Sequence, residues 1–112
     1  MSEEIKKLTT ITLEVGLDEN HIPVDMDWSA SDSGEKGKCK AFLLSIWDEK
    51  DENTMSIDLW TKEMSVYDMQ RFFHQTLLTM SDTYKNATNE DEVSAEFRAF
   101  AEKFATKTGI LG

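Results

Sequence analysis

The chain has 112 residues, of which 39% are hydrophobic and 30% are charged, a balance typical of one globular domain. Its 22 acidic and 12 basic residues give a formal net charge of −10, which repels nucleic-acid backbones and anionic lipid surfaces. We therefore expect no nucleic-acid partner.

The N-terminal segment and the single cysteine indicate a cytoplasmic protein. The opening residues MSEEIKKLTT lack the positive first region and the apolar run of a signal peptide. No apolar run approaches the ~20 residues that span a bilayer. Cys39 has no second cysteine with which to form a disulfide. We expect a cytoplasmic location without membrane insertion.

Two segments near the N-terminus predict a first β-hairpin. Apolar and polar residues alternate over about residues 7–17 and again over about 22–28, and Asp18–His21 supplies the turn. Both strands then place their apolar side chains on one side of the hairpin. The segment Ser29–Lys38, SASDSGEKGK, is small and polar, so we expect a long loop there, whose order the sequence leaves open.

Two strands at about residues 39–47 and 54–61 predict a second hairpin around the acidic turn Asp48–Asn53. Three apolar cross-strand pairs should then share one buried face. The pairs are Phe42 with Leu59, Leu44 with Ile57, and Ile46 with Met55.

The other face of this second hairpin carries large apolar residues among polar ones. Leu43, Trp47 and Trp60 lie on it. Tryptophan is enriched at binding hot spots, so these residues are a candidate interface with a second copy or a ligand. The alternative is that a loop of the same chain, such as Ser29–Lys38, covers them.

The C-terminal half predicts two helices, at about residues 66–85 and 90–107. Ser65 with Asp68 resembles a capping box at the start of the first helix, and Asn89 with Glu92 gives a second capping signal. Gly109 is placed to end the second helix. We therefore predict a single α+β domain over residues 1–112, with a four-stranded antiparallel sheet of two hairpins followed by two helices.

No segment indicates a reaction, and we assign no catalytic, cofactor-binding or metal site. His21 is more simply a solvated turn residue than a metal ligand, because it lacks convergent partners. His74 flanks the apolar stripe of the first helix, where a general base would need a substrate pocket. Cys39 is more simply a small buried residue than a nucleophile.

Two long runs, CKAFLLSIWDEKDENTMSIDLWTKEM and FFHQTLLTMSDTY, resemble the gliding motility-associated GldC family of Bacteroidota. The resemblance extends over about residues 5–85. It implies a role in gliding motility, in bacteria whose gliding apparatus is linked to a dedicated protein-secretion system. It brings no catalytic residues with it.

These observations leave three classes of function. The first is a non-enzymatic interaction protein, a homo-oligomer with protein partners of the gliding or secretion machinery, acting through Leu43, Trp47 and Trp60. The second is a chaperone for unfolded export clients, because the order of strands and helices is similar to that of SecB, a likeness of fold alone. The third is an enzyme with a site around His74.

Overall fold

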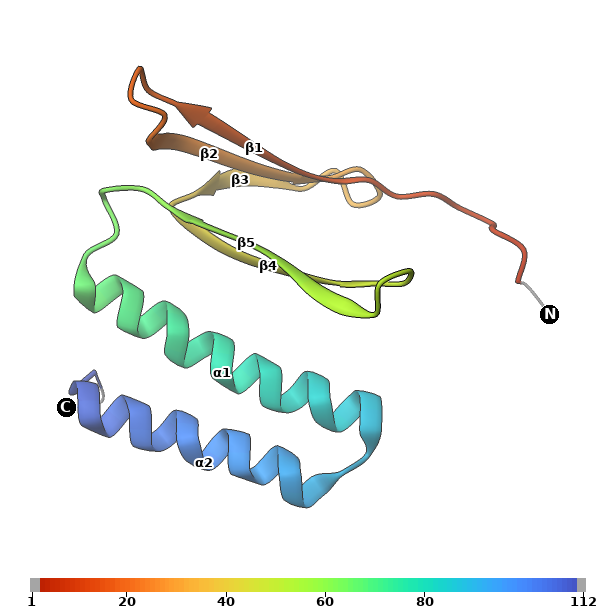
Figure 1. Ribbon diagram of the computed structural model, residues 1–112, viewed down its shortest axis with the longest axis vertical. Coiled ribbons are helices and arrows are strands. Elements are labelled where there is room, and N and C mark those ends of the chain that lie inside the picture. Colours follow the sequence, from red (N-terminus) through yellow and green to blue (C-terminus); the bar gives the residue numbers. More distant parts are fainter. Residues whose placement is uncertain (1–2, 111–112) are drawn as a thin grey trace. The chain divides into compact units, whose positions relative to one another are not determined.

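The computed structural model describes residues 3–110. The chain divides into two compact units, Met1–Met64 and Ser65–Gly112. The described strands all lie in the first unit and both helices in the second, so the α+β class is as expected (Figure 1). The strands are β1 (Ile11–Leu17), β2 (Pro23–Ala30), β3 (Lys36–Cys39), β4 (Ala41–Asp48) and β5 (Asn53–Trp60). The helices are α1 (Val66–Thr88) and α2 (Asp91–Thr108).

Strands β1, β2 and β3 form an antiparallel sheet in that order. Leu13 lies opposite Trp28, and Val15 lies opposite Met26, so the apolar residues of β1 and β2 share one face as predicted. Met26 also lies opposite Cys39 of β3 and is only 1% exposed. Met26 therefore lies in the buried core of the first unit.

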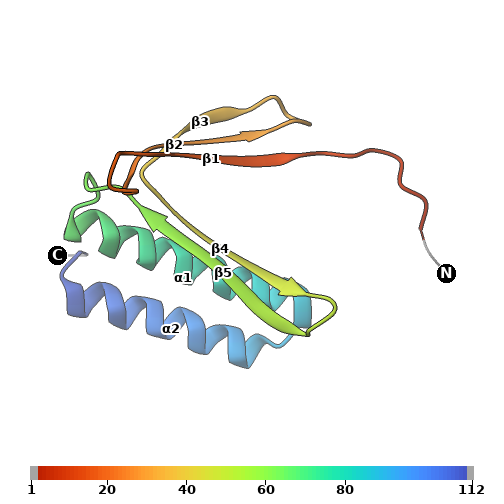
Figure 2. The same cartoon turned by 45° about the horizontal axis from the view of Figure 1, so that its top comes forward.

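The predicted single four-stranded sheet is wrong. The segment expected as its third strand, about residues 39–47, lies mostly in β4, and only Cys39 of it belongs to β3. Strands β3 and β4 belong to a three-stranded and a two-stranded sheet. Figure 2 shows the β4–β5 hairpin diverging from the first sheet where β4 leaves β3. Across this break the Thr61 N–H donates to the Lys40 carbonyl at 2.9 Å, which holds the two ends of the hairpin together.

Most of the predicted loop Ser29–Lys38 is a β-hairpin. The Ala30 N–H donates to the Glu35 carbonyl at 2.9 Å, and Gly34 closes the turn with a φ of 73° that favours glycine. Gly37 lies opposite Trp28, and a Cβ atom at Gly37 would lie 3.0 Å from the indole Nε1. Glycine at this position lets the indole lie directly against β3.

The β4–β5 hairpin has the predicted register. Phe42 pairs with Leu59, Leu44 with Ile57, and Ile46 with Met55. Its turn is held by Asp48, whose carboxylate accepts from the Asp51 N–H at 2.7 Å and whose carbonyl accepts from the Glu52 N–H at 2.9 Å. Period-two alternation excludes a slip of one residue, which would exchange the two faces, and the turn then fixes the register.

The second unit is an antiparallel pair of helices (Figure 1). Ser65 caps α1 as predicted, since its Oγ accepts from the Asp68 N–H at 3.0 Å. The predicted cap at Asn89 is wrong: Asn89 ends α1 in a left-handed conformation, and Glu90 precedes α2. Asparagine is common both as a helix N-cap and as the left-handed residue that ends a helix. Here the Asn89 N–H donates to the Lys85 carbonyl at 2.7 Å. Gly109 ends α2 as expected, with a φ of 80°.

Small residues line the contact between the helices. Ser81, Ser94, Ala101 and Ala105 are all buried. Small side chains let two helix backbones approach closely, so larger groups must pack at the margins of the contact. The Tyr84 and Phe97 rings lie there, with their centroids 5.6 Å apart.

Candidate interaction surface on the β4–β5 hairpin

The first face of the β4–β5 hairpin is entirely apolar along three cross-strand pairs. Ile46, Met55 and Ile57 are each about half exposed, while their neighbours Phe42 and Leu59 are less so. An isolated two-stranded hairpin is marginally stable in water. The exposed residues lie towards the turn, so this end of the hairpin has the most apolar surface available for contact.

The second face carries the three residues that the sequence singled out. Trp47 is 67% exposed, Trp60 is 57% exposed and Leu43 is 39% exposed. The alternative, that the loop Ser29–Lys38 buries the tryptophans, is not what the structure has. Both tryptophans are exposed, and most of Ser29–Lys38 belongs to the first sheet and its β2–β3 turn.

The two tryptophans stand at opposite ends of this second face. Trp47 lies opposite Thr54 near the turn, whereas Trp60 lies opposite Ala41 at the open end. Six strand residues at ~3.3 Å each separate the two rows by roughly 20 Å. Between them, Ser45 Oγ and Ser56 Oγ lie 3.2 Å apart in a hydrogen bond. The second face therefore has two apolar ends around a polar middle.

At the open end, Trp60 contributes to a groove between the start of β2 and the end of β5. Its lining residues are Ile22, Pro23, Asp58, Leu59, Trp60 and Lys62. Pro23 has no N–H and cannot donate a backbone hydrogen bond in this groove. A carboxylate and an ammonium group flank the apolar wall. Sequence reasoning did not find this groove, because it forms only where the two sheets of the first unit meet.

At the turn, Trp47 adjoins the acidic residues of the hairpin. Glu49, Asp51 and Glu52 are exposed, and none of them forms an ion pair with another residue in the range 3–110. Lys50 is the one cation within the turn. This end of the hairpin combines exposed apolar side chains with unpaired negative charge.

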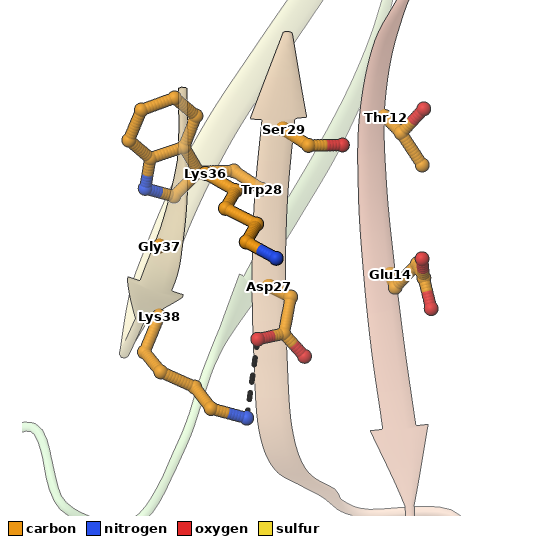
Figure 3. Close-up of a pocket in the computed structure, with 8 residues that line it drawn as sticks. All are labelled: Thr12, Glu14, Asp27, Trp28, Ser29, Lys36, Gly37 and Lys38. Carbon is orange, nitrogen blue, oxygen red and sulfur yellow. Dashed lines mark ion pairs between the residues drawn. The ribbon is translucent and has the colours of Figure 1, made fainter. Parts of the chain in front are cut away.

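A second depression lies on the polar face of the three-stranded sheet (Figure 3). The Lys38 ammonium lies 3.0 Å from the Asp25 carboxylate and 3.1 Å from that of Asp27. Hydrogen bonds to these two carboxylates raise the pKa of Lys38. All three side chains are solvated, and exposed ion pairs of this kind contribute little to stability. We assign no site to this face.

The residues considered for chemistry lie in separate settings. His21 is exposed in the β1–β2 turn, with its N–H donating to the Asp18 carbonyl at 2.9 Å. His74 is half-buried on α1. Cys39 is half-buried in β3, where desolvation and, secondarily, the charge of Asp27 raise the pKa of its thiol. Within residues 3–110 no three His, Cys, Asp or Glu side chains are grouped to hold a metal ion.

The helices are too polar or too short to cross a bilayer, as judged over the described part of the chain.

A protein-family model described as "Gliding motility-associated protein GldC-like" matches residues 23–110. The match includes all of β2 to β5 and both helices, which is more than half of the chain. The chain belongs to the GldC-like family. Comparison of this GldC-like chain with curated proteins and with solved structures gives no significant match. Family membership associates the chain with gliding motility. The matched residues include the whole β4–β5 hairpin.

Proposed function

We propose that this GldC-like chain is a non-enzymatic, cytoplasmic interaction protein that supports bacterial gliding motility by binding protein through its β4–β5 hairpin. The observation that supports the proposal most is the exposure of Trp47 and Trp60 on one face of that hairpin. Family membership supplies the process.

The energetic argument rests on the two tryptophans. A tryptophan side chain buries up to ~200 Å², and more than half of that area is still exposed at each position. Covering the remainder at ~25 cal/mol per Å² contributes about 3 kcal/mol per side chain before the costs of association. Because the tryptophans lie at opposite ends, a partner that covers both must extend along the hairpin. That partner is a second copy of the chain or another protein of the gliding or secretion machinery.

The test is a double variant, Trp47→Ser with Trp60→Ser. The helices should stay folded, as measured by circular dichroism, while light scattering across a concentration series should show loss of association. Phe100→Ser is the matched control, because Phe100 of α2 is exposed to a similar extent outside the hairpin. The double variant should also fail to restore gliding to a strain that lacks the gene. Wild-type association together with full restoration of gliding would refute the proposal.

A chaperone that holds unfolded export clients is the second candidate. It is supported by the half-exposed Ile46, Met55 and Ile57, because such apolar strand surface suits unfolded chains. This function predicts that the purified protein slows aggregation of an unfolded client without any nucleotide. No protection at several-fold molar excess would exclude it.

A further inference from the structure

The backbone of β5 has one free edge. Over residues 3–110, β5 pairs with β4 alone, so one side of the strand has no backbone partner there. The Thr61 N–H donates to the Lys40 carbonyl at 2.9 Å, which makes these two residues a hydrogen-bonded pair of the ladder. Hydrogen-bonded and non-hydrogen-bonded pairs alternate along an antiparallel ladder. The residues whose N–H and C=O groups point away from β4 are therefore Thr54, Ser56, Asp58 and Trp60.

Strand β5 lacks the features that protect other edge strands from pairing. Its eight residues include one ionisable side chain, Asp58, and no proline. By contrast, the short strand β3 carries Lys36 and Lys38, and β1 has an irregular register between Gly16 and Leu17. Lysines and bulges discourage edge pairing, whereas a long, apolar edge strand invites it. The edge of β5 is therefore open to an added strand.

Strand β5 is also more exposed than its partner in the hairpin. Leu59 is its single half-buried residue, and the others are exposed. In β4 the half-buried residues are Ala41, Phe42, Leu44 and Asp48. Of the two free edges of the hairpin, the edge of β5 therefore has more surface to bury against a partner.

One antiparallel register of β5 against a second β5 matches apolar residues with apolar ones. A twofold axis at Ile57 places this residue opposite its own copy. Met55 then lies opposite Leu59 of the second copy, on the same face. Moving the axis one residue towards the C-terminus would put Asp58 opposite Asp58, and moving it one residue the other way would put Leu59 opposite Asn53. The axis at Ile57 is therefore the favoured register.

The same register satisfies the free backbone groups of β5. The outward-pointing residues meet one another in it, Thr54 opposite Trp60 and Ser56 opposite Asp58. Within each chain, Trp47 already lies opposite Thr54. Trp47, Thr54 and Trp60 of the second copy therefore form one row across three strands, with the two indoles on either side of the small threonine. The row brings both tryptophans of each copy into the interface.

We propose that two copies of the chain pair through the free edges of their β5 strands, antiparallel about Ile57, and form one four-stranded sheet. The inference rests on the proposed function, because it names both the occupant of the hairpin surface and the strand that binds it. Pairing also stabilises the hairpin, since a sheet of two strands is marginal in water and three or more strands are needed. The second faces of the two hairpins then become one surface that carries Trp47 and Trp60 of both copies.

The register can be tested with a single cysteine in a Cys39→Ser background. Ile57→Cys places two thiols opposite each other at the twofold axis, where the Cα atoms of a non-hydrogen-bonded pair are ~4.5 Å apart. That separation permits a disulfide, so oxidised glutathione should link the chains into a covalent dimer. Met55→Cys is the matched control, because Met55 is exposed to a similar extent. Its two copies lie four residues apart along the ladder, roughly 13 Å, and should not link.

The edge itself can be tested with proline. Ser56→Pro removes an N–H that points away from β4, so the β4–β5 ladder keeps its backbone hydrogen bonds. Each dimer loses two backbone hydrogen bonds, and the dimer dissociation constant should rise at least about tenfold. Ser45→Pro is the matched control, because Ser45 lies opposite Ser56 and its N–H points to the free edge of β4. Both variants also lose the same hydrogen bond between the two hydroxyls.

Sedimentation across a concentration series measures these constants, and circular dichroism shows whether each variant is folded. Weaker association in Ser45→Pro but not in Ser56→Pro would overturn the inference, as would a wild-type chain that stays monomeric. Equal cross-linking of Ile57→Cys and Met55→Cys, or none with Ile57→Cys, would also overturn it. The cysteine pair decides the question by itself if Ser56→Pro does not fold.

The outcomes separate this inference from the proposed function. If Trp47→Ser with Trp60→Ser abolishes association while folded Ser56→Pro leaves it unchanged, edge pairing fails and the proposed function stands. If neither variant changes association or gliding, both fail.

Discussion

Ser81 of α1 and Ser94 of α2 hydrogen-bond to each other's backbone in both directions. Ser81 Oγ donates to the Ser94 carbonyl at 2.8 Å, and Ser94 Oγ donates to the Ser81 carbonyl at 2.8 Å. The two hydroxyl oxygens lie 3.0 Å apart, and both residues are buried. The helices can approach this closely because serine is small. Each buried hydroxyl also has a hydrogen-bond partner in the backbone carbonyl of the other serine.

This reciprocal contact predicts two different costs of substitution. Ser81→Ala should lower the free energy of unfolding by about 1 kcal/mol, because it removes one buried hydrogen bond. Ser81→Leu should cost about 1–3 kcal/mol by overpacking the contact. Chemical denaturation measures both, with the exposed Thr83→Ala on the same helix as control. Equal stability of Ser81→Leu and the wild type would mean that the helices are not closely packed at this point.

Gly37 should tolerate an added side chain poorly. A Cβ atom there would lie 3.0 Å from Trp28 Nε1, so Gly37→Ala should displace the indole and destabilise the first unit by about 1–3 kcal/mol. Gly16→Ala is the control, because its Cβ would have an ordinary closest contact of 3.4 Å with the Asp25 carbonyl. Thermal unfolding of the two variants should separate them, and a Gly37→Ala variant as stable as Gly16→Ala would contradict this packing.

Position 89 should tolerate glycine better than any β-branched residue. Its φ of 60° lies in the left-handed region, which costs most residues roughly 1–2 kcal/mol. We expect Asn89→Gly to be neutral or stabilising, and Asn89→Val to lower the melting temperature. Were Asn89 a helix N-cap instead, Asn89→Ser would be harmless; as the left-handed end of α1, it should destabilise. Differential scanning calorimetry distinguishes these outcomes.

Cys39 should react slowly with thiol reagents near pH 8. Burial raises the pKa of its thiol, so the thiolate fraction is below that of a free cysteine. Since the folded-state pKa lies above the unfolded one, any pH effect of this group on stability is a loss as the pH rises past the unfolded pKa. Alkylation rates from pH 7 to 10 measure the shift. Met26→Ala, which removes the buried residue opposite Cys39, should accelerate the reaction.

Local sequence patterns correctly predicted those features of the fold that depend on one hydrophobic period or on one helix cap. The faces of β4 and β5 follow from alternation, and the polar turn between them selects the register, because a slip of two residues would still leave both apolar trios on one face. The start of α1 follows from Ser65, whose hydroxyl bonds a backbone group three residues away. Asn89 shows the limit of this reasoning, because its neighbours do not say whether it starts one helix or ends another.

The polar segment between β2 and β4 required the folded structure. Lys36–Cys39 has no apolar alternation, yet it pairs with β2 as a strand, and Gly37 lets the indole of Trp28 lie close to its backbone. Such cross-strand contacts are invisible to a local pattern. Because β3 pairs with β2 and β4 pairs with β5, the strands form two sheets instead of the expected single one.

Some features of the candidate surface follow from the sequence, and others depend on the tertiary structure. The sequence by itself determined that Leu43, Trp47 and Trp60 share a hairpin face, since the side chains of a strand alternate strictly. Tertiary structure alone decided that Trp60 lines a groove with Pro23, and that Ser29–Lys38 pairs within the first sheet and leaves both tryptophans exposed. Alternation is a property of neighbouring residues, whereas what lies beside a side chain depends on residues distant in the chain.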